Sequence, residues 1–137
     1  MTFQEIKDQI MFQTNNDADD IEDFLPHVDD YVNDGYDRLV RAWMGQHVPD
    51  GGTPRLKEPT DVPRLPEWTH RAICDWATWL VYRNGNPQKQ QRGLMFLRNF
   101  EECLGKCKDL AGRATVNEEM GEITFAKNLP QFYNYRP

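Results

Sequence analysis

The stretch Tyr82-Arg83-Asn84-Gly85-Asn86-Pro87 separates two segments in which apolar residues recur every three or four positions. Glycine often adopts a left-handed backbone conformation just after the end of a helix, and Gly85 is in position to do so. The asparagine and proline that follow are typical of an N-cap and of the first turn of a new helix. A connection this short makes two helices fold back on each other as an antiparallel pair. We therefore predict antiparallel helices over residues 67–84 and 87–111.

Two further helices are predicted nearer the start of the sequence. The run Thr2-Phe3-Gln4-Glu5 has the spacing of a capping box, which favours a helix over residues 3–13. Apolar residues at spacings of three and four then predict a long amphipathic helix over residues 20–46. Pro26 is compatible with that helix if its regular part begins near Leu25, and a kink at the proline is the alternative.

These four segments predict an all-α fold, a four-helix bundle-like domain over residues 1–112. Residues 48–66 interrupt it with a segment rich in proline and glycine, which excludes a helix and disfavours a central strand. We expect a long ordered or semi-ordered loop there, whose role the sequence does not indicate. Its five prolines are Pro49, Pro54, Pro59, Pro63 and Pro66.

The helical pattern stops after Gly112, and residues 113–137 form a separate region rich in aromatic residues. A disordered terminus rarely carries so many aromatic side chains. We predict an extended C-terminal arm that needs a partner surface, with residues 121–125 as its strand.

The charge of the chain is unevenly distributed. The net charge is −6, residues 1–48 carry eleven acidic and three basic side chains, and residues 67–112 carry five acidic and seven basic ones. This disfavours ordinary duplex-DNA binding, which needs clustered Lys and Arg, and favours association with copies of the chain or with another protein. No apolar run is long enough to span a bilayer, and the N-terminus lacks the pattern of a secretory signal, so we expect synthesis in the cytoplasm.

The three cysteines raise the question of a metal. His70 and Cys74, and likewise Cys103 and Cys107, are four residues apart, so two helix faces could offer three thiols and an imidazole to zinc. However, the cysteines coincide with apolar stripes, where a thiol behaves as a small hydrophobic side chain, and we expect His70 near an exposed helix start. We predict free thiols and no bound metal.

No catalytic motif is present in the sequence. A nucleophile elbow, a phosphate-binding Gly-rich loop and a His-Glu-x-x-His pattern are all missing. The acidic run at residues 17–23 fails as a calcium loop, because Glu22 stands where glycine is needed and Val28 stands at the twelfth position. We predict a non-enzymatic protein without a cofactor.

Three tryptophans on one predicted helix, Trp68, Trp76 and Trp79, could form a ligand-binding box. At spacings of eight and three residues they fit a buried helix face better. We therefore assign them to the core.

The order of these segments resembles a known family. The long acidic helix, the Pro-rich loop, the helix Pro66–Trp79, the turn Tyr82–Pro87 with the polar run Gln88–Gly93, and the aromatic arm resemble small neck proteins encoded among the head genes of phages and prophages of gut bacteria. The plan is similar to that of the head-tail connector (adaptor) family of tailed bacteriophages. The resemblance covers most of the chain. It rests on the order of the structural elements and on short stretches of similar sequence.

This resemblance implies a structural subunit of the virion neck. Its members are helical bundles that form a ring, usually of twelve copies, on the portal protein and extend the DNA channel toward downstream neck and tail proteins. Such a subunit lies close to packaged DNA without specific binding and involves no membrane. The arm would dock on the portal, in part by strand addition. The residues assigned to this docking are Ile123, Phe125, Leu129, Phe132, Tyr133 and Tyr135.

The charge asymmetry fits such a ring. An acidic stripe on the second predicted helix and a set of basic residues on the fourth would let neighbouring copies meet head to tail. Alternatively, the acidic stripe lines the channel and repels DNA phosphates. The acidic residues are Asp30, Asp34 and Asp37, and the basic ones are Lys89, Arg92, Lys106 and Lys108.

Two other functions stay open from the sequence. One is a tail-completion or stopper protein of the same particle, which would sit further down the neck. A small helical phage regulator is the other, although the expected basic DNA-binding surface is missing.

Overall fold

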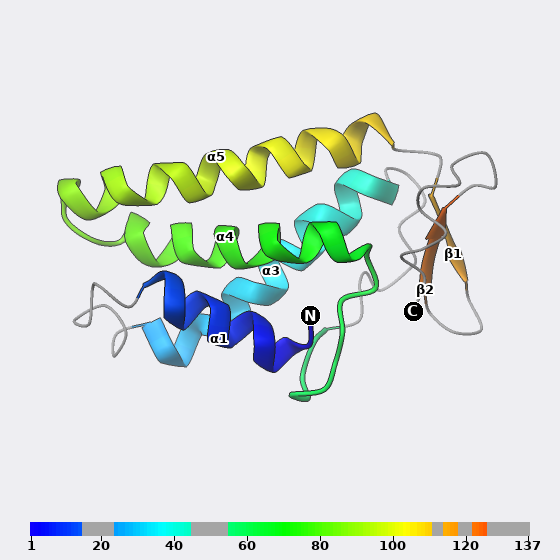
Figure 1. The fold of residues 1–137 in the computed structure, drawn as a ribbon, viewed down its shortest axis with the longest axis horizontal. Helices are drawn as coiled ribbons and strands as arrows, with labels where there is room; N and C mark the ends of the chain where they lie inside the picture. Colours follow the sequence, from blue (N-terminus) through cyan, green and yellow to red (C-terminus); the bar gives the residue numbers. More distant parts are fainter. Residues whose placement is uncertain (15–23, 45–54, 111–113, 118–121, 126–137) are drawn as a thin grey trace.

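The computed structural model describes residues 1–14, 24–44, 55–110, 114–117 and 122–125. Figure 1 shows a bundle of helices with a small β-hairpin beyond one end. The elements in chain order are α1 (Phe3–Gln13), the 3-10 turn η1 (Leu25–His27), α3 (Val28–Met44), α4 (Glu67–Arg83), α5 (Pro87–Asp109), β1 (Ala114–Asn117) and β2 (Glu122–Phe125). The predicted all-α, four-helix bundle-like fold is confirmed.

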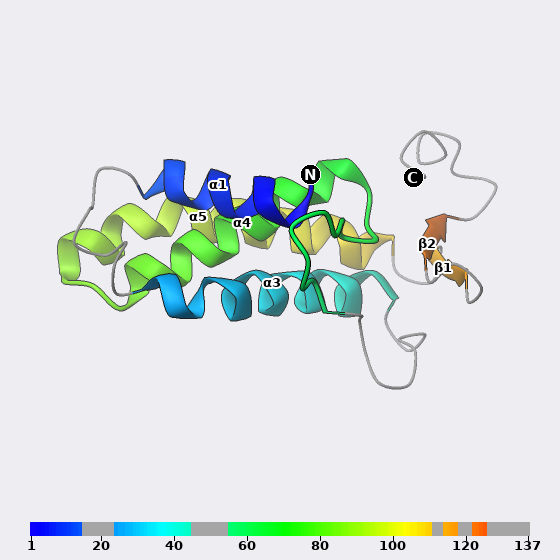
Figure 2. The ribbon, with the colours of Figure 1, turned by 90° about the horizontal axis from the view of Figure 1, so that it is seen from below.

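Helix α4 is the centre of this bundle. Figures 1 and 2 show α5 and α1 on two sides of α4 and α3 on a third. Twelve of its seventeen residues are buried, so α4 has almost no outer face. A helix that is buried on nearly every side is a central element of the core rather than a surface helix.

The turn between α4 and α5 confirms the predicted antiparallel pair (Figure 1). Asn86 is the N-cap of α5, its side chain accepts a hydrogen bond from the Lys89 amide at 2.9 Å, and Pro87 begins the helix. The prediction of a left-handed conformation at Gly85 is wrong, because the φ angle of Gly85 does not lie in the positive region.

The carbonyl groups at the end of α4 show why no left-handed residue is needed there. The amide of Gly85 donates to the Tyr82 carbonyl at 3.0 Å, which closes the helix with a tight turn. The Asn84 side chain donates to the carbonyl of Leu80, and Gln90 donates to the carbonyls of both Arg83 and Gly85. Side chains thus satisfy groups that a Schellman motif would satisfy with a left-handed glycine.

The second predicted helix begins later than expected. Its regular part, α3, starts at Val28, and the 3-10 turn η1 with Pro26 precedes it. Proline lacks the amide that a continuous α-helix would use, and the Val28 amide instead bonds to the Leu25 carbonyl three residues back. Residues 20–23 and 45–46 of the prediction lie outside the described residues.

Side chains of α3 hold the described part of the Pro-rich loop, residues 55–66. The amide side chain of Asn33 donates to the Leu56 carbonyl at 3.1 Å and accepts from the Leu56 amide at 2.7 Å. The Tyr36 hydroxyl accepts from the Arg64 amide at 2.8 Å. This part of the loop is therefore ordered; residues 48–54 lie outside the described residues.

The same loop caps the start of α1. Two of the amides that a helix N-terminus leaves without intrahelical partners donate to loop carbonyls: Phe3 to Asp61 at 2.7 Å and Gln4 to Pro59 at 3.1 Å. The predicted capping box between Thr2 and Glu5 supplies the remaining contacts and is confirmed. The loop thus ties α1 to α3.

The C-terminal region contains the predicted strand, but the strand has a partner in its own chain. β2 pairs antiparallel with β1, with Ala114 opposite Phe125 and Val116 opposite Ile123. β1 approaches α3, and the hairpin lies beyond the end of the helices in both views (Figures 1 and 2). The change from helix to strand falls near the predicted boundary at residues 112 and 113.

Among the described helices, none combines the length and the apolar composition that a membrane-spanning helix needs.

Candidate interaction surface

The acidic stripe predicted on α3 is present, but basic residues of the same chain accompany it. Asp34 forms an ion pair with Arg38 at 2.8 Å, and Asp37 forms one with Arg41 at 2.7 Å. Both pairs have the i, i+4 spacing that brings side chains together on a helix.

Two more ion pairs link α3 to other parts of the molecule. Asp30 pairs with Arg55 of the Pro-rich loop, and Asp29 pairs with Lys7 of α1 at 3.4 Å. Exposed pairs of this kind contribute only about 0–1 kcal/mol each, but they cancel much of the local field. The stripe therefore presents alternating charges to a neighbour rather than an acidic surface.

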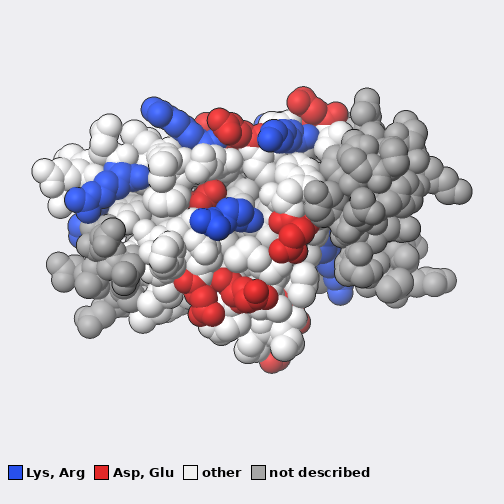
Figure 3. Space-filling model, viewed as in Figure 1, with Lys and Arg blue, Asp and Glu red and all other residues white. Residues whose placement is uncertain are grey.

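The charges on the opposite side of the molecule are also mixed. Figure 3 shows acidic and basic side chains interspersed over the face formed by α5, α4 and α1. The four predicted basic residues do not form one patch, because Lys89 and Arg92 lie near the start of α5 and Lys106 and Lys108 near its end. At about 1.5 Å per residue, roughly 25 Å of helix separates Lys89 from Lys106.

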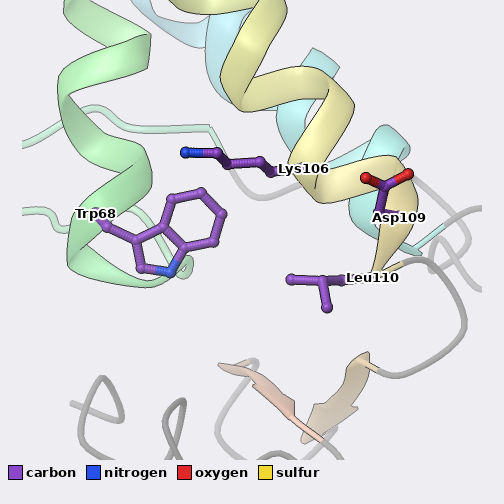
Figure 4. A pocket seen from close by; sticks show the side chains of 4 residues that line it. All are labelled: Trp68, Lys106, Asp109 and Leu110. Atoms are coloured by element: carbon purple, nitrogen blue, oxygen red, sulfur yellow. The ribbon is translucent and has the colours of Figure 1, made fainter.

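An open groove of about 460 Å³ lies at the end of the bundle nearest the hairpin. Figure 4 shows Trp68 of α4 on one side of it and Lys106, Asp109 and Leu110 at the end of α5 on the other. The groove combines an aromatic ring with one charge of each sign. Lys106, predicted as a contact residue, is therefore part of a concave surface.

The three predicted core tryptophans differ in burial. Trp76 is buried and packs on Phe100 of α5, with ring centroids 4.7 Å apart. Trp68 and Trp79 are half-buried and pack against the core, Trp68 next to Trp43 of α3. The assignment to the core is confirmed for Trp76, whereas Trp68 also lines the groove.

His70 is buried, and the expectation that it lies near an exposed helix start is wrong. Only 1% of its surface is exposed, and its ring contacts Leu65 of the Pro-rich segment and Met1, which precedes α1. Its Nε2 lies 2.8 Å from the Leu65 carbonyl, which only accepts, so Nε2 carries the proton and Nδ1 accepts from the amino group of Met1 at 2.8 Å. Burial lowers the pKa of His70 and favours this neutral form.

The cysteines do not come together as a metal site. Cys74 is buried with its thiol toward the carbonyls of Ile6 and His70, and burial raises its pKa to about 12. Cys103 and Cys107 are buried on α5. Among the residues that the structure describes, no three His, Cys, Asp or Glu side chains are grouped as metal ligands. The absence of bound metal stays a prediction.

A buried polar network between α1 and α4 was missed by the sequence analysis. Gln13 at the end of α1 donates to the Asp75 carboxylate at 2.9 Å and accepts from the Thr78 hydroxyl at 2.6 Å, while its carbonyl accepts from the Tyr82 hydroxyl. Burial raises the pKa of Asp75. The signal for this network was the polar pair Asp75 and Thr78, three residues apart within the apolar run from Ala72 to Val81.

Only two of the six predicted docking residues lie in the part of the chain that the structure describes. Ile123 and Phe125 belong to β2. The other four, Leu129, Phe132, Tyr133 and Tyr135, lie outside the described residues.

The fold and these surfaces define a small helical-bundle protein with an appended β-hairpin. No family model, no curated protein and no solved structure matches the chain.

Proposed function

We propose that this protein is a non-enzymatic structural subunit of a bacteriophage neck, in which a ring of copies attaches to the portal protein and connects head to tail around the DNA channel. It would be made in the host cytoplasm and reside in the virion neck. The observation that carries the proposal is the division of the chain into a helical body and a strand-bearing C-terminal element beyond one end of that body (Figures 1 and 2). This is the plan that the resemblance to head-tail connectors implies.

The hairpin supports docking by strand addition. In the described two-stranded sheet, each four-residue strand pairs with the other along one edge, which leaves its second edge open to a further strand. A hairpin of this size has marginal stability by itself in water. A strand from the portal added to β2 would supply main-chain hydrogen bonds, and the aromatic residues further along the arm would supply side-chain contacts. Residues 113–137 are therefore the proposed portal-binding arm.

The charge distribution supports close packing of similar subunits. Since the acidic residues of α3 already have intrachain basic partners, two copies could approach at this face without strong repulsion. The same pairing weakens the alternative in which the stripe repels DNA in the channel, because Arg38 and Arg41 stand beside the carboxylates. We therefore assign the α3 face to contact between subunits.

The test is assembly with the portal protein encoded in the same phage genome. The chain alone and the mixture would be measured by mass photometry and electron microscopy, and we expect rings of about twelve copies attached to the portal. A monomer that does not bind the portal at micromolar concentration would contradict the proposal. Density in the lower neck, away from the portal, would assign the chain to the stopper position instead.

A matched pair of variants tests the arm itself. Replacing Phe132 and Tyr133 together with alanine should weaken portal binding at least tenfold, since truncating a buried aromatic anchor commonly costs about 2 kcal/mol or more. The control replaces Gln131 and Asn134, polar neighbours in the same segment, and should bind as the unmodified chain does. Equal loss in both variants would show that the aromatic residues are not anchors.

A further inference from the structure

Helix α5 has an outer face on which no described element packs. Its inner face contacts α4 and α3, and Figure 1 shows no described helix or strand on its other side. Positions that advance by four and three residues follow one line along a helix. Six such positions of α5 are exposed, and at 3.6 residues per turn they lie opposite its buried residues. This outer stripe consists of Gln91, Met95, Arg98, Glu102, Gly105 and Asp109.

The outer stripe is complementary to its own reverse. If a second α5 lies antiparallel and crosses a two-fold axis at the level of Phe100, residues equally far from Phe100 face each other. Met95 then faces Gly105 of the second copy, and Arg98 faces Glu102 of the second copy. The two-fold axis repeats each contact, so both occur twice. The alternation of four and three residues is also the spacing that paired helices use.

The charges of the outer stripe are available for this contact. Arg98 and Glu102 form no ion pair with any residue that the structure describes. They are four residues apart, but a basic residue before an acidic one is the less favourable order on a helix. Asp34 and Arg38 of α3 have the favourable order and do pair. Arg98 and Glu102 can therefore pair between copies without breaking an ion pair within the described part of the chain.

The shapes of the stripe are complementary as well. The Met95 side chain is 58% exposed, which is unusual for a large hydrophobic residue in this bundle. A Cβ atom at Gly105 would meet nothing within 4 Å, so the helix surface there is open to an incoming side chain. Methionine is flexible and fills irregular space well. Farther from the axis, the Gln91 amide can donate to the Asp109 carboxylate of the second copy.

We propose that the outer stripe of α5 is a self-association surface, on which a second copy of this chain packs antiparallel with Met95 over Gly105 and Arg98 beside Glu102. The reversed complementarity selects a second copy as the partner. This inference does not depend on the proposed neck function. A two-fold contact joins copies in pairs, whereas the α3 face is assigned to contacts within a ring, which run head to tail.

The association should be weak. From Gln91 to Asp109 the stripe is about 27 Å long, and with a helix diameter of about 10 Å it covers roughly 300 Å² on each copy. A stable interface of standard size buries about 800 Å² on each partner. Like charges also meet at the edges, where Arg92 lies near Lys106 of the second copy and Glu101 near its own counterpart. We expect a dissociation constant in the upper micromolar range.

Two charge reversals test the pairing. In Arg98→Glu a carboxylate would face Glu102 of the second copy, and in Glu102→Arg two guanidinium groups would face each other. Each variant alone should therefore associate at least tenfold more weakly than the unmodified chain, because like charges opposite each other are costly and the axis repeats them. A mixture of the two variants has opposite charges at both contacts and should associate about as well as the unmodified chain. Sedimentation equilibrium of the full chain up to millimolar concentration measures all four samples.

Lys57→Glu and Glu58→Arg are the matched controls. They make the same charge changes at exposed positions of the Pro-rich loop, away from α5 (Figure 1), and should associate as the unmodified chain does. A chain that stays monomeric up to millimolar concentration would overturn the proposal. So would an oligomer that neither reversal weakens, or a loss that mixing does not restore. An oligomer that ignores both reversals would place the contact elsewhere, which leaves the proposed ring untouched.

Gly105→Leu tests the seat of Met95. Within one chain the added side chain meets open space, and leucine is a better helix former than glycine, so the variant should fold. Circular dichroism checks this. In the pair the leucine side chain would occupy the space that Met95 of the second copy needs, so association should fall at least tenfold. Unchanged or stronger association of the folded variant would contradict the proposed packing.

Discussion

The indole nitrogen of Trp76 donates a hydrogen bond of 2.8 Å to the carboxylate of Asp34. The same carboxylate oxygen accepts from Arg38, whose guanidinium lies 4.6 Å from the centre of the Trp76 ring. One residue of α4 is therefore held by a hydrogen bond and a cation–π contact from α3. This contact joins the predicted acidic stripe to the core, so Asp34 stabilises the fold as well as forming part of the surface.

Close packing of α3 on Trp76 makes Gly35 a sensitive position. A Cβ atom at Gly35 would lie 2.9 Å from Cδ1 of Trp76. Gly35→Ala should therefore lower the free energy of unfolding by about 1–3 kcal/mol, the usual cost of overpacking, as measured by urea denaturation.

The matched control for that substitution is Gly105→Ala on α5. A Cβ atom there meets nothing within 4 Å, and Gly105 is an exposed residue in the interior of α5. Alanine should raise stability by roughly 0.5–1 kcal/mol, because glycine is a poor helix former. The packing explanation fails if both variants change stability in the same direction.

Asp75→Asn should stabilise the protein at neutral pH. Burial raises the pKa of Asp75 in the folded state above its usual value of 3.8. A raised carboxyl pKa means that the stability contribution is present below the unfolded value and is lost as pH rises through the folded value. The gain from asparagine should therefore be near zero at acidic pH and grow above about pH 4.

Urea denaturation of both proteins from pH 3 to pH 8 measures this difference. Asparagine keeps the oxygen that accepts from Gln13, so the network of hydrogen bonds is preserved. A constant difference across the pH range would show that the charge of Asp75 is not what is removed.

Asn33→Ala should release the Pro-rich loop from α3. The variant loses both hydrogen bonds to the Leu56 backbone, and the expected cost is about 1–3 kcal/mol because the buried backbone groups are left without partners. Hydrogen exchange at the Leu56 amide should also become faster. The exposed Asn99→Ala serves as control and should change stability by no more than about 0.5 kcal/mol.

Deleting residues 114–137 should leave the helicity and the melting temperature nearly unchanged. The hairpin lies beyond the helices, and where the structure describes side-chain burial, the buried hydrophobic residues of the core belong to residues 3–107. The same deletion should abolish portal binding. If the truncated chain unfolds in a thermal scan followed by circular dichroism, the arm packs on its own bundle and the proposed docking role loses its support.

Stoichiometric metal should be undetectable in the purified protein. The Cys74 thiol is directed toward backbone carbonyls, and Cys103 and Cys107 are buried on α5. Elemental analysis after dialysis measures this, and one zinc per chain would contradict the prediction.

The sequence by itself determined the features that depend on neighbouring residues. The capping box at Thr2, the N-cap at Asn86 and the antiparallel α4–α5 pair follow from local hydrogen bonding and from apolar periodicity. It also placed Asp30, Asp34 and Asp37 on one helix, but it did not identify their basic partners. The strand Glu122–Phe125 was predicted on the same local basis, but its partner was not.

The tertiary structure decided which distant groups meet. The sequence shows Asp34 and Trp76, but their hydrogen bond joins residues 42 positions apart and has no local pattern. The burial of His70 likewise depends on Leu65 and on the start of α1, which cover it only after the chain has folded. Local propensities act over about one helical turn, whereas burial and ion pairing depend on contacts between elements, and packing of the whole core selects those contacts.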